Sequence, residues 1–459
     1  MTRRSRFSIL CVVFLGLIAP AFAQWNEQVL YSFQGLPDGA GPTGRIVSDA
    51  QGNLYGATGE GGSSSCAGPA QCGTVYELSP PTKNGDAWIE TILHVFQGRA
   101  FGDGSTPGGG LVMDAAGNLY GTAAYDGTGP CRLLGGLVGC GVIYEMAPPA
   151  QPGGAWTESV IYNFQGGSDG YFPAGDLVFD KVGNLYGATV FGGGRGINCG
   201  NSLDQNCGTI FELSPPQQKG GAWTEKVLYS FAGIQTWSTL SDGAQPNGGL
   251  VFDEAGDIYG TTAFGGSAAG AACRSTGCGT VFELIPPQEE GGIWTEEVLH
   301  GFLAQPTDGA GPYGNLVLSA GALYGTTRGG GGREDGVIFQ LEPSGNGNGG
   351  WVENLLHVFT NGSDGLQPSS LIPSPNGAFY GTAQGSPTRG GLIFQLQPPA
   401  QKGGAWSLVP EYDFTGPPNG YGPFVLSLVP SHHEMYGSTI EGGTGPCNGG
   451  CGTIFGVKP

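Results

Sequence analysis

The stretch Trp223-Thr-Glu-Lys-Val-Leu-Tyr-Ser-Phe231 opens a pattern that recurs along the 459-residue chain. Trp294-Thr-Glu-Glu-Val-Leu-His-Gly-Phe302 repeats it closely, and five further tryptophans begin an extended apolar run of the same kind. Neighbouring members of this series are 55 to 71 residues apart; they are Trp25, Trp88, Trp156, Trp223, Trp294, Trp351 and Trp406. Such spacing indicates a tandem repeat in which each copy is one supersecondary unit.

Each repeat contains four strand-like segments. The Trp-led run is followed by an Asp-Gly turn with a Pro, then by a Leu-Val segment, a Leu-Tyr-Gly segment and a Gly-Thr-Val-Phe segment. Four short strands repeated seven times are typical of a β-propeller. The sequence therefore predicts an all-β fold, a seven-bladed β-propeller with four antiparallel strands per blade.

The two ends of the sequence predict how the ring closes. The first Trp-led strand, Trp25–Phe33, has no inner strands before it, whereas the last repeat supplies three strands and no outer one: Phe424–Val429, Met435–Thr439 and Gly452–Val457. We expect the N-terminal strand to complete the last blade, which leaves no exposed sheet edge. Within a blade, the apolar segment represented by Gly249–Asp253 is expected to be innermost, preceded by a loop that carries Asp-Gly.

The N-terminus has the features of a secretory signal peptide. Arg3, Arg4 and Arg6 precede the apolar segment Ile9–Ile18 and the small-residue site at Ala21-Phe-Ala23. No later stretch is long and apolar enough to span a bilayer. We therefore expect a signal peptide at 1–23, a single propeller domain at 24–459, no membrane insertion, and a secreted or periplasmic location.

Charge and composition narrow the choice of partners. The formal net charge is −20, and a strongly negative field disfavours nucleic-acid binding because it repels phosphate. The 91 glycines and 33 prolines would fit a disordered chain, but the periodic aromatic and β-branched runs indicate regular buried faces. We expect an ordered monomer whose partner is a glycan or an extracellular protein.

Ten of the eleven cysteines form close pairs, which supports export. Each pair precedes the Gly-Thr-Val-Phe segment of its repeat, and the fifth and sixth repeats lack both members. Gain or loss in pairs predicts local disulfides, worth about 2 kcal/mol each for such short loops. Metal ligation is the alternative, but the spacings vary and no His accompanies them. The predicted bonds are Cys66–Cys72, Cys131–Cys140, Cys199–Cys207, Cys273–Cys278 and Cys447–Cys451.

A family resemblance rests on these repeated segments. Tyr259-Gly-Thr-Thr262 with Gly265-Gly266 and Gly279-Thr-Val-Phe-Glu-Leu284 resembles the tandem repeat of the bacterial GloVer-type family, as does Leu323-Tyr-Gly-Thr-Thr327. The resemblance extends over essentially the whole chain after the leader. It implies an exported bacterial repeat protein without an established activity, and it supplies no catalytic residues.

Residues that recur in every repeat are interpreted as structural. The Asp of the Asp-Gly turn is expected to build that turn, although a ring of acids also suits Ca²⁺. His94, His300 and His357 take the position that Tyr holds in other repeats, so they are interpreted as fillers. No Ser/His/Asp or Cys/His constellation is recognisable, and we predict no cofactor and no metal site.

The candidate site lies where the repeats differ. Four residues after the Gly of each Tyr-Gly, the chain carries acids in two adjacent blades, aromatic residues in three and glycine in two; Arg328 lies one residue before this position. In ring order from the last blade these residues are Glu441, Glu60, Tyr125, Phe191, Phe264, Gly329 and Gly385. Aromatic rings stack on sugar faces and carboxylates accept hydrogen bonds from hydroxyls, so this arc suits a glycan. The other interpretation is that the aromatic rings pack under the cysteine loops.

Two functions follow from these residues. The first is an exported, non-catalytic binding or scaffold protein that engages extracellular polysaccharide or another surface component. The alternative is a polysaccharide-active glycosidase or lyase that uses Glu60 and Glu441. Glycosidases need two carboxyl groups about 5–5.5 Å apart for retention or about 6.5–9.5 Å apart for inversion.

Overall fold

A computed structural model describes most of the chain after residue 24. The described residues are 25–66, 72–83, 85–133, 136–151, 153–194, 207–218, 220–233, 241–266, 273, 276–289, 291–345, 350–385, 389–401, 403–429 and 434–458. The predicted signal peptide lies outside them.

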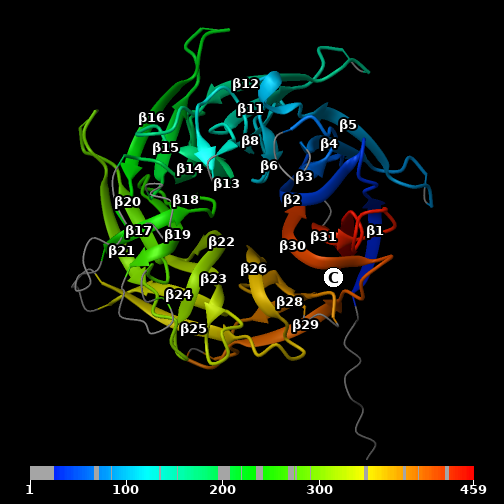
Figure 1. The fold of residues 1–459 in the computed structure, drawn as a ribbon. Helices are drawn as coiled ribbons and strands as arrows, with labels where there is room; N and C mark the ends of the chain where they lie inside the picture. The colour runs from blue at the N-terminus through cyan, green and yellow to red at the C-terminus, as the bar shows by residue number, and fades with distance from the viewer. Residues whose placement is uncertain are drawn as a thin grey trace, which may run out of the picture.

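Seven antiparallel sheets form a closed ring, which confirms the predicted seven-bladed propeller (Figure 1). The strands, from inner to outer, are as follows. Blade 1 has β2 (Gly39–Ser48), β3 (Leu54–Gly61), β4 (Thr74–Ser79) and β5 (Ile89–Val95); blade 2 has β6 (Ser105–Pro107) with β7 (Val112–Met113), β8 (Leu119–Tyr125), β11 (Val142–Ala147) and β12 (Thr157–Asn163). Blade 3 has β13 (Tyr171–Phe179), β14 (Leu185–Phe191), β15 (Thr209–Ser214) and β16 (Thr224–Ser230); blade 4 has β17 (Ser241–Pro246) with β18 (Val251–Phe252), β19 (Ile258–Gly266), β20 (Thr280–Ile285) and β21 (Thr295–Gly301). Blade 5 has β22 (Gly309–Ser319), β23 (Ala322–Gly330), β24 (Val337–Pro343) and β25 (Trp351–Val358); blade 6 has β26 (Leu366–Pro373), β27 (Phe379–Gln384), β28 (Leu392–Gln397) and β29 (Ser407–Asp413).

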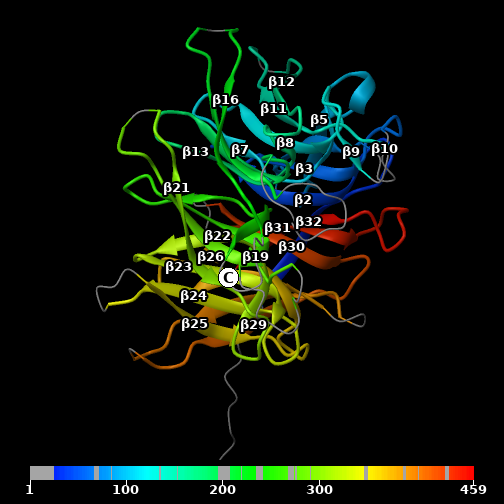
Figure 2. The same cartoon turned by 60° about the vertical axis from the view of Figure 1, so that its left-hand side comes forward.

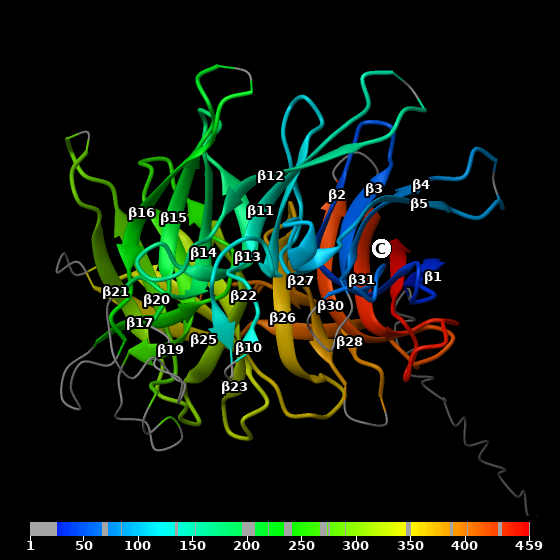
Figure 3. The ribbon, with the colours of Figure 1, turned by 45° about the horizontal axis from the view of Figure 1, so that its top comes forward.

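Blade 7 is built from both ends of the chain. Its inner strands are β30 (Gly420–Val429), β31 (Glu434–Gly442) and β32 (Thr453–Lys458), and the N-terminal β1 (Asn26–Ser32) pairs with β32 as the outer strand. The register joins Asn26 to Lys458 at one end and Ser32 to Thr453 at the other. Figures 1 and 3 show the blue β1 beside the red C-terminal strands. The predicted clasp is confirmed.

Two shorter elements complete the list. A small hairpin, β9 (Arg132–Leu133) and β10 (Gly136–Leu137), lies between β8 and β11, and a 3₁₀ turn, η1, spans Gly98–Ala100. Among the described residues, no helix is long and apolar enough to cross a membrane.

The innermost strands begin earlier than the sequence predicts. The Asp-Gly segment was expected to be a loop, yet β2, β13 and β22 already pair with the second strand there, before a register shift in mid-strand. The third residue after the Asp has a positive φ and bonds to the preceding blade, as the Phe172 N–H does to the Cys140 carbonyl at 2.9 Å. This extra backbone bond makes the entry segment a strand that joins two blades.

Aromatic side chains fill the space between blades. Phe231, at the end of the outer strand of blade 3, is fully buried and meets Phe282 of blade 4 edge-on, with ring centroids 5.2 Å apart. Equivalent contacts include Phe302 with Phe339 and Phe33 with Tyr76. Gly208 has φ +96°, and a Cβ there would lie 2.7 Å from Pro246 Cδ of the next blade, so glycine is required. The turned view in Figure 2 shows the blades packed face against face around the ring.

Candidate functional site

The cysteine loops and the entries to the inner strands lie on one face, because strand direction alternates within each blade. We call it the cysteine-loop face. Four of the predicted disulfides are present, Cys66–Cys72, Cys131–Cys140, Cys273–Cys278 and Cys447–Cys451. Cys199, of the remaining pair, lies outside the described residues. Bonded cysteines are typical of proteins outside the reducing cytoplasm, so an extracellular or periplasmic location is supported.

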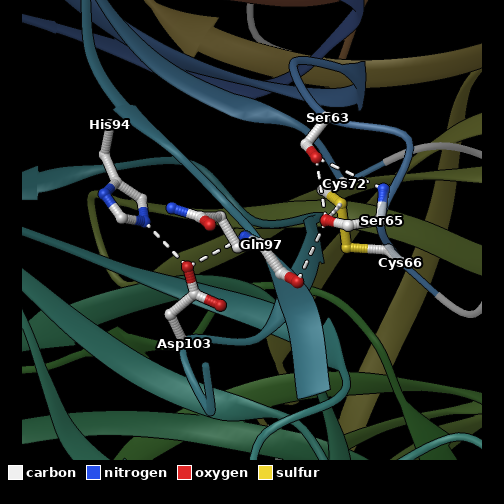
Figure 4. Close-up of polar contacts among 7 residues, drawn as sticks. All are labelled: Ser63, Ser65, Cys66, Cys72, His94, Gln97 and Asp103. Atoms are coloured by element: carbon white, nitrogen blue, oxygen red, sulfur yellow. Dashed lines mark hydrogen bonds and ion pairs between the residues drawn. A yellow bond between two sulfur atoms is a disulfide. The ribbon is translucent and has the colours of Figure 1, made fainter. Parts of the chain in front are cut away.

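Figure 4 shows how one cysteine loop is held to the next blade. The Ser65 hydroxyl beside Cys66–Cys72 donates a hydrogen bond to the Gln97 carbonyl at 3.2 Å. The Gln97 N–H in turn donates to Asp103 Oδ2 at 2.9 Å, and His94 Nε2 lies 3.2 Å from the same oxygen. The repeated Asp therefore organises the entry turn and orients the loop above it.

The six rim residues predicted from the sequence occupy different surroundings. Glu60, at the end of β3, and Glu441, at the end of β31, are exposed and belong to adjacent blades. Phe264 packs against the buried cluster that contains Phe231 and Phe282, and Arg328 lies over the ring of Tyr313. Tyr125 and Phe191 are half-buried and contact a common neighbour. The structure thus separates the predicted arc into carboxylates, an aromatic cluster and an axial arginine.

Phe172 is the common neighbour, and the sequence analysis missed it. Its ring centroid lies 4.7 Å from that of Tyr125 and 5.7 Å from that of Phe191, which also contacts Tyr171. We call Tyr125, Tyr171, Phe172 and Phe191 the aromatic cluster. Phe172 has φ +65°, an uncommon conformation for a bulky residue. Other blades place Gly, Thr or Gln at this position, a difference that would have flagged it.

The innermost strands surround a small cavity. A cavity of about 70 Å³ is lined by residues of the innermost strands, among them Asn247, Tyr313, Ser370 and Phe424. The Asn247 Oδ1 and Ser370 Oγ atoms are buried without a hydrogen-bond partner in the described structure. This volume is well below the about 300–1,000 Å³ of typical small-molecule pockets. A larger ligand must therefore sit at the mouth of the cavity.

A hydrogen-bond network links the innermost strands of several blades. Asp176 Oδ1 accepts from the Gly110 N–H and Oδ2 from Asn315 Nδ2, both at 2.6 Å, and Asn315 Oδ1 accepts from the Gly249 N–H at 2.7 Å. These residues come from blades 2, 3, 4 and 5. The network therefore joins the innermost strands of four blades.

Arg328 and Tyr313 form the charged part of this mouth. The guanidinium carbon lies 3.4 Å from the centroid of the Tyr313 ring, a stacked cation–π contact. Burial raises the pKa of Tyr313, and the neighbouring Arg328 charge opposes that rise. The phenol therefore stays protonated and can donate a hydrogen bond.

A wider pocket of about 730 Å³ lies on the opposite face, between blades 3 and 4. Phe179, Phe252 and Trp294 line it, together with the carboxylates of two hairpin turns. One of these, Asp180, accepts the N–H groups of Val182 and its neighbours, so it builds the turn. The pocket thus offers apolar surface but few polar groups for chemistry, and we place the candidate site on the cysteine-loop face.

Six of the seven junctions between blades carry a polar triad. It consists of a Tyr or His in one outer strand, an Asp or Asn in the following turn, and a Glu in the next outer strand. The complete triads are Tyr31/Asp38/Glu90, His94/Asp103/Glu158, Tyr162/Asp169/Glu225, Tyr229/Asp242/Glu296, His300/Asp308/Glu353 and Tyr412/Asn419/Glu27. His357 and Asp364 form the remaining junction, with Leu408 in the Glu position. We call these groups junction triads; each Glu keeps a buried Oε1 with no partner among the described residues.

The junction glutamates predict that stability falls in mildly alkaline solution. Burial, reinforced by the nearby Asp, raises the pKa of Glu90 and Glu225 to about 7 and that of Glu296 to about 8. A carboxyl group with a raised pKa stabilises the fold fully below its unfolded value of 4.5, and this stabilisation is lost as pH rises through the folded value. We expect the melting temperature to fall between about pH 5 and about pH 9.

Two sets of Glu→Gln variants distinguish the titration of the junction glutamates from general charge repulsion. Replacing Glu90, Glu225 and Glu296 together with Gln should flatten the melting temperature between those pH values. Replacing the exposed Glu289 with Gln should leave the wild-type slope. A wild-type melting temperature that rises over this range would contradict the account.

Comparisons with known proteins agree with this architecture. The model of the Gloeobacter/Verrucomicrobia repeat matches residues 18–197 and 131–349. A Lactobacillus plantarum protein of known structure is 13% identical, with a TM-score of 0.50, and the match covers 84% of this chain and 88% of that chain. A comparison with curated proteins finds no match.

Other solved propellers bear the names of enzymes. A glucose dehydrogenase-like oxidoreductase from Thermus thermophilus is 11% identical, with a TM-score of 0.42 and coverage of 94% of this chain and 99% of that chain. A gluconolactonase from Xanthomonas campestris is 13% identical, with a TM-score of 0.35 and coverage of 75% and 82%. At such identities the likeness extends to the fold alone. These names contradict the prediction of a non-catalytic binding or scaffold protein, which we correct: this fold is shared with enzymes, so it gives no ground for excluding catalysis.

Proposed function

Because the chain belongs to the Gloeobacter/Verrucomicrobia repeat family, whose name specifies no activity, we propose its function from the site: a polysaccharide-active enzyme that cleaves glycosidic bonds. The observation that carries the proposal is the aromatic cluster on the same face as the Arg328–Tyr313 pair. Phe172 lies two residues before Ala174 in β13, and Ala174 has the position in its blade that Tyr313 has in blade 5. Both groups therefore include residues near the entry ends of inner strands, on the cysteine-loop face.

The chemistry of these side chains matches a sugar chain. Half-buried rings from two blades offer apolar surface on which sugar rings stack, while Arg328 and the Tyr313 hydroxyl donate hydrogen bonds to sugar oxygens. The net charge of −20 disfavours a highly anionic polymer, so a neutral glycan is the proposed substrate class.

Glu60 and Glu441 are the proposed catalytic carboxylates. They lie at equivalent positions of adjacent blades, on the face that carries the aromatic cluster. Hydrolysis needs one carboxylic acid to protonate the leaving oxygen and one carboxylate to act as nucleophile or base. The anomeric configuration of the first product distinguishes retention from inversion.

Export completes the proposal. We propose that residues 1–23 are removed as a signal peptide and that residues 24–459 act as one secreted or periplasmic domain. The four disulfides support a location outside the cytoplasm. Mass measurement of protein recovered from its producing cells tests the cleavage position.

Kinetics of site variants test the proposed roles. On a neutral polysaccharide that the wild type cleaves, Glu60→Gln and Glu441→Gln should each lower kcat by about 10²–10⁴-fold, the usual range for loss of acid or base catalysis. Phe191→Ala should instead raise KM, because it removes stacking surface. Glu289→Gln, an exposed acid in the hairpin between β20 and β21 on the opposite face, should behave as wild type. Unchanged kcat in a Glu60/Glu441 double variant would remove these residues from the reaction.

A further inference from the structure

The junction triad between blades 4 and 5 shares its His, Asp and Glu composition with His94/Asp103/Glu158 but differs from the other triads in spacing. His300 lies in β21, Asp308 in the turn before β22, and Glu353 in β25. His300 Nε2 is 3.2 Å from Asp308 Oδ1 and 3.8 Å from Glu353 Oε2. The three ligand atoms lie within 4.8 Å of one another, which holds for no other group of three such residues in the described structure.

These distances fit a shared metal ion. Zinc binds His nitrogen at about 2.0–2.1 Å and carboxylate oxygen at about 2.0–2.2 Å in tetrahedral geometry, so two ligand atoms of one site are about 3.4 Å apart. The two distances from His300 bracket that value. Asp308 Oδ1 also accepts the Gly309 N–H at 2.7 Å, a bond that fixes the carboxylate and leaves its second lone pair for an ion.

A bound cation would compensate the negative charge at this junction. Two carboxylates face one imidazole, and the side chains are only 21%, 8% and 11% exposed for His300, Asp308 and Glu353. Glu353 Oε1, like that of the other junction glutamates, is buried without a partner in the described structure, and the charged groups that act on Glu353 are His300 and Asp308. Buried carboxylates without a matching cation are costly, and a divalent ion removes that cost directly.

We propose that His300, Asp308 and Glu353 bind one zinc ion that joins blade 4 to blade 5. One nitrogen and two oxygens leave a fourth position for water, as in other three-ligand zinc sites. Blade 5 carries no cysteine pair in its loop between the second and third strands. The ion would therefore join blade 4, which has a disulfide in this loop, to blade 5, which has none.

The chain supplies its own matched control. At the junction between blades 3 and 4 the same triad is Tyr229/Asp242/Glu296, so His300→Tyr reproduces an arrangement that this fold already contains. Chelator-treated wild type should take up one equivalent of zinc more than His300→Tyr in titration calorimetry. Zinc should also raise the melting temperature of the wild type and leave that of His300→Tyr unchanged.

Two further variants test zinc binding independently of whether His300→Tyr folds. Glu353→Gln should bind zinc at least about 10-fold more weakly, since it removes a charged ligand. His357→Tyr should keep the wild-type stoichiometry, because Leu408 replaces the Glu at that junction. The proposal is overturned if wild type and His300→Tyr take up the same amount of zinc, or if calcium but not zinc raises the melting temperature.

Discussion

A chain that starts after Phe33 is expected to lose much of its stability, because the last blade then has no outer strand. β1 pairs with β32 along its whole length, and Trp25 and Phe33 at its ends are 8% and 0% exposed. Loss of the Phe33 ring alone should cost about 3–5 kcal/mol, and the unpaired edge of β32 adds to it. Urea unfolding of the truncated chain against the chain that starts at residue 24 measures the difference.

A control variant of the longer chain keeps β1 and removes only the buried ring of Phe33. Phe33→Ala in the longer chain should account for part of the loss, whereas Glu342→Gln at an exposed position of β24 should account for none. Equal unfolding free energies for the truncated and longer chains would contradict the clasp.

Phe231→Ala is expected to lower the unfolding free energy by about 3–5 kcal/mol, the usual loss for a fully buried ring. Phe231 has no exposed surface and joins blades 3 and 4 through Phe282. Phe191→Ala, in the aromatic cluster, should cost only about 0.5–1.5 kcal/mol, since its half-buried ring loses mainly ring contacts. Denaturation curves of both variants measure these losses.

The comparison between the two variants decides what the aromatic cluster does. A small loss for Phe191→Ala with a clear loss of sugar binding supports a binding surface. A loss as large as that of Phe231→Ala would mean that Phe191 is part of the core beneath the cysteine loops.

The repeat made the architecture predictable because each copy buries the same positions. The seven Trp-led strands give the blade count, and the unmatched strands at the two ends give the pairing of β1 with β32. The paired cysteines give the loop disulfides for the same reason. The prediction was wrong only about where the inner strands begin. Their first residues make backbone hydrogen bonds to the preceding blade, as Phe172 does, and such bonds leave no periodic side-chain signal in the sequence.

The site was less predictable because its parts come from different blades. Tyr313 and Asn315 resemble ordinary members of an inner strand, and only the folded ring brings Asn315 to Asp176 across 139 residues. The junction glutamates, two residues after six of the seven repeat tryptophans, resemble solvent-facing residues of an edge strand. Their burial follows from the next blade, which one repeat by itself does not contain.

The most direct test of the proposed function is the chain length of a neutral polysaccharide after incubation with purified residues 24–459, measured by size-exclusion chromatography. The account predicts that at least one polymer of a panel is shortened by the wild type and left intact by the Glu60→Gln/Glu441→Gln variant. Unchanged chain lengths across the panel, with protein that is folded and disulfide-bonded, would contradict it.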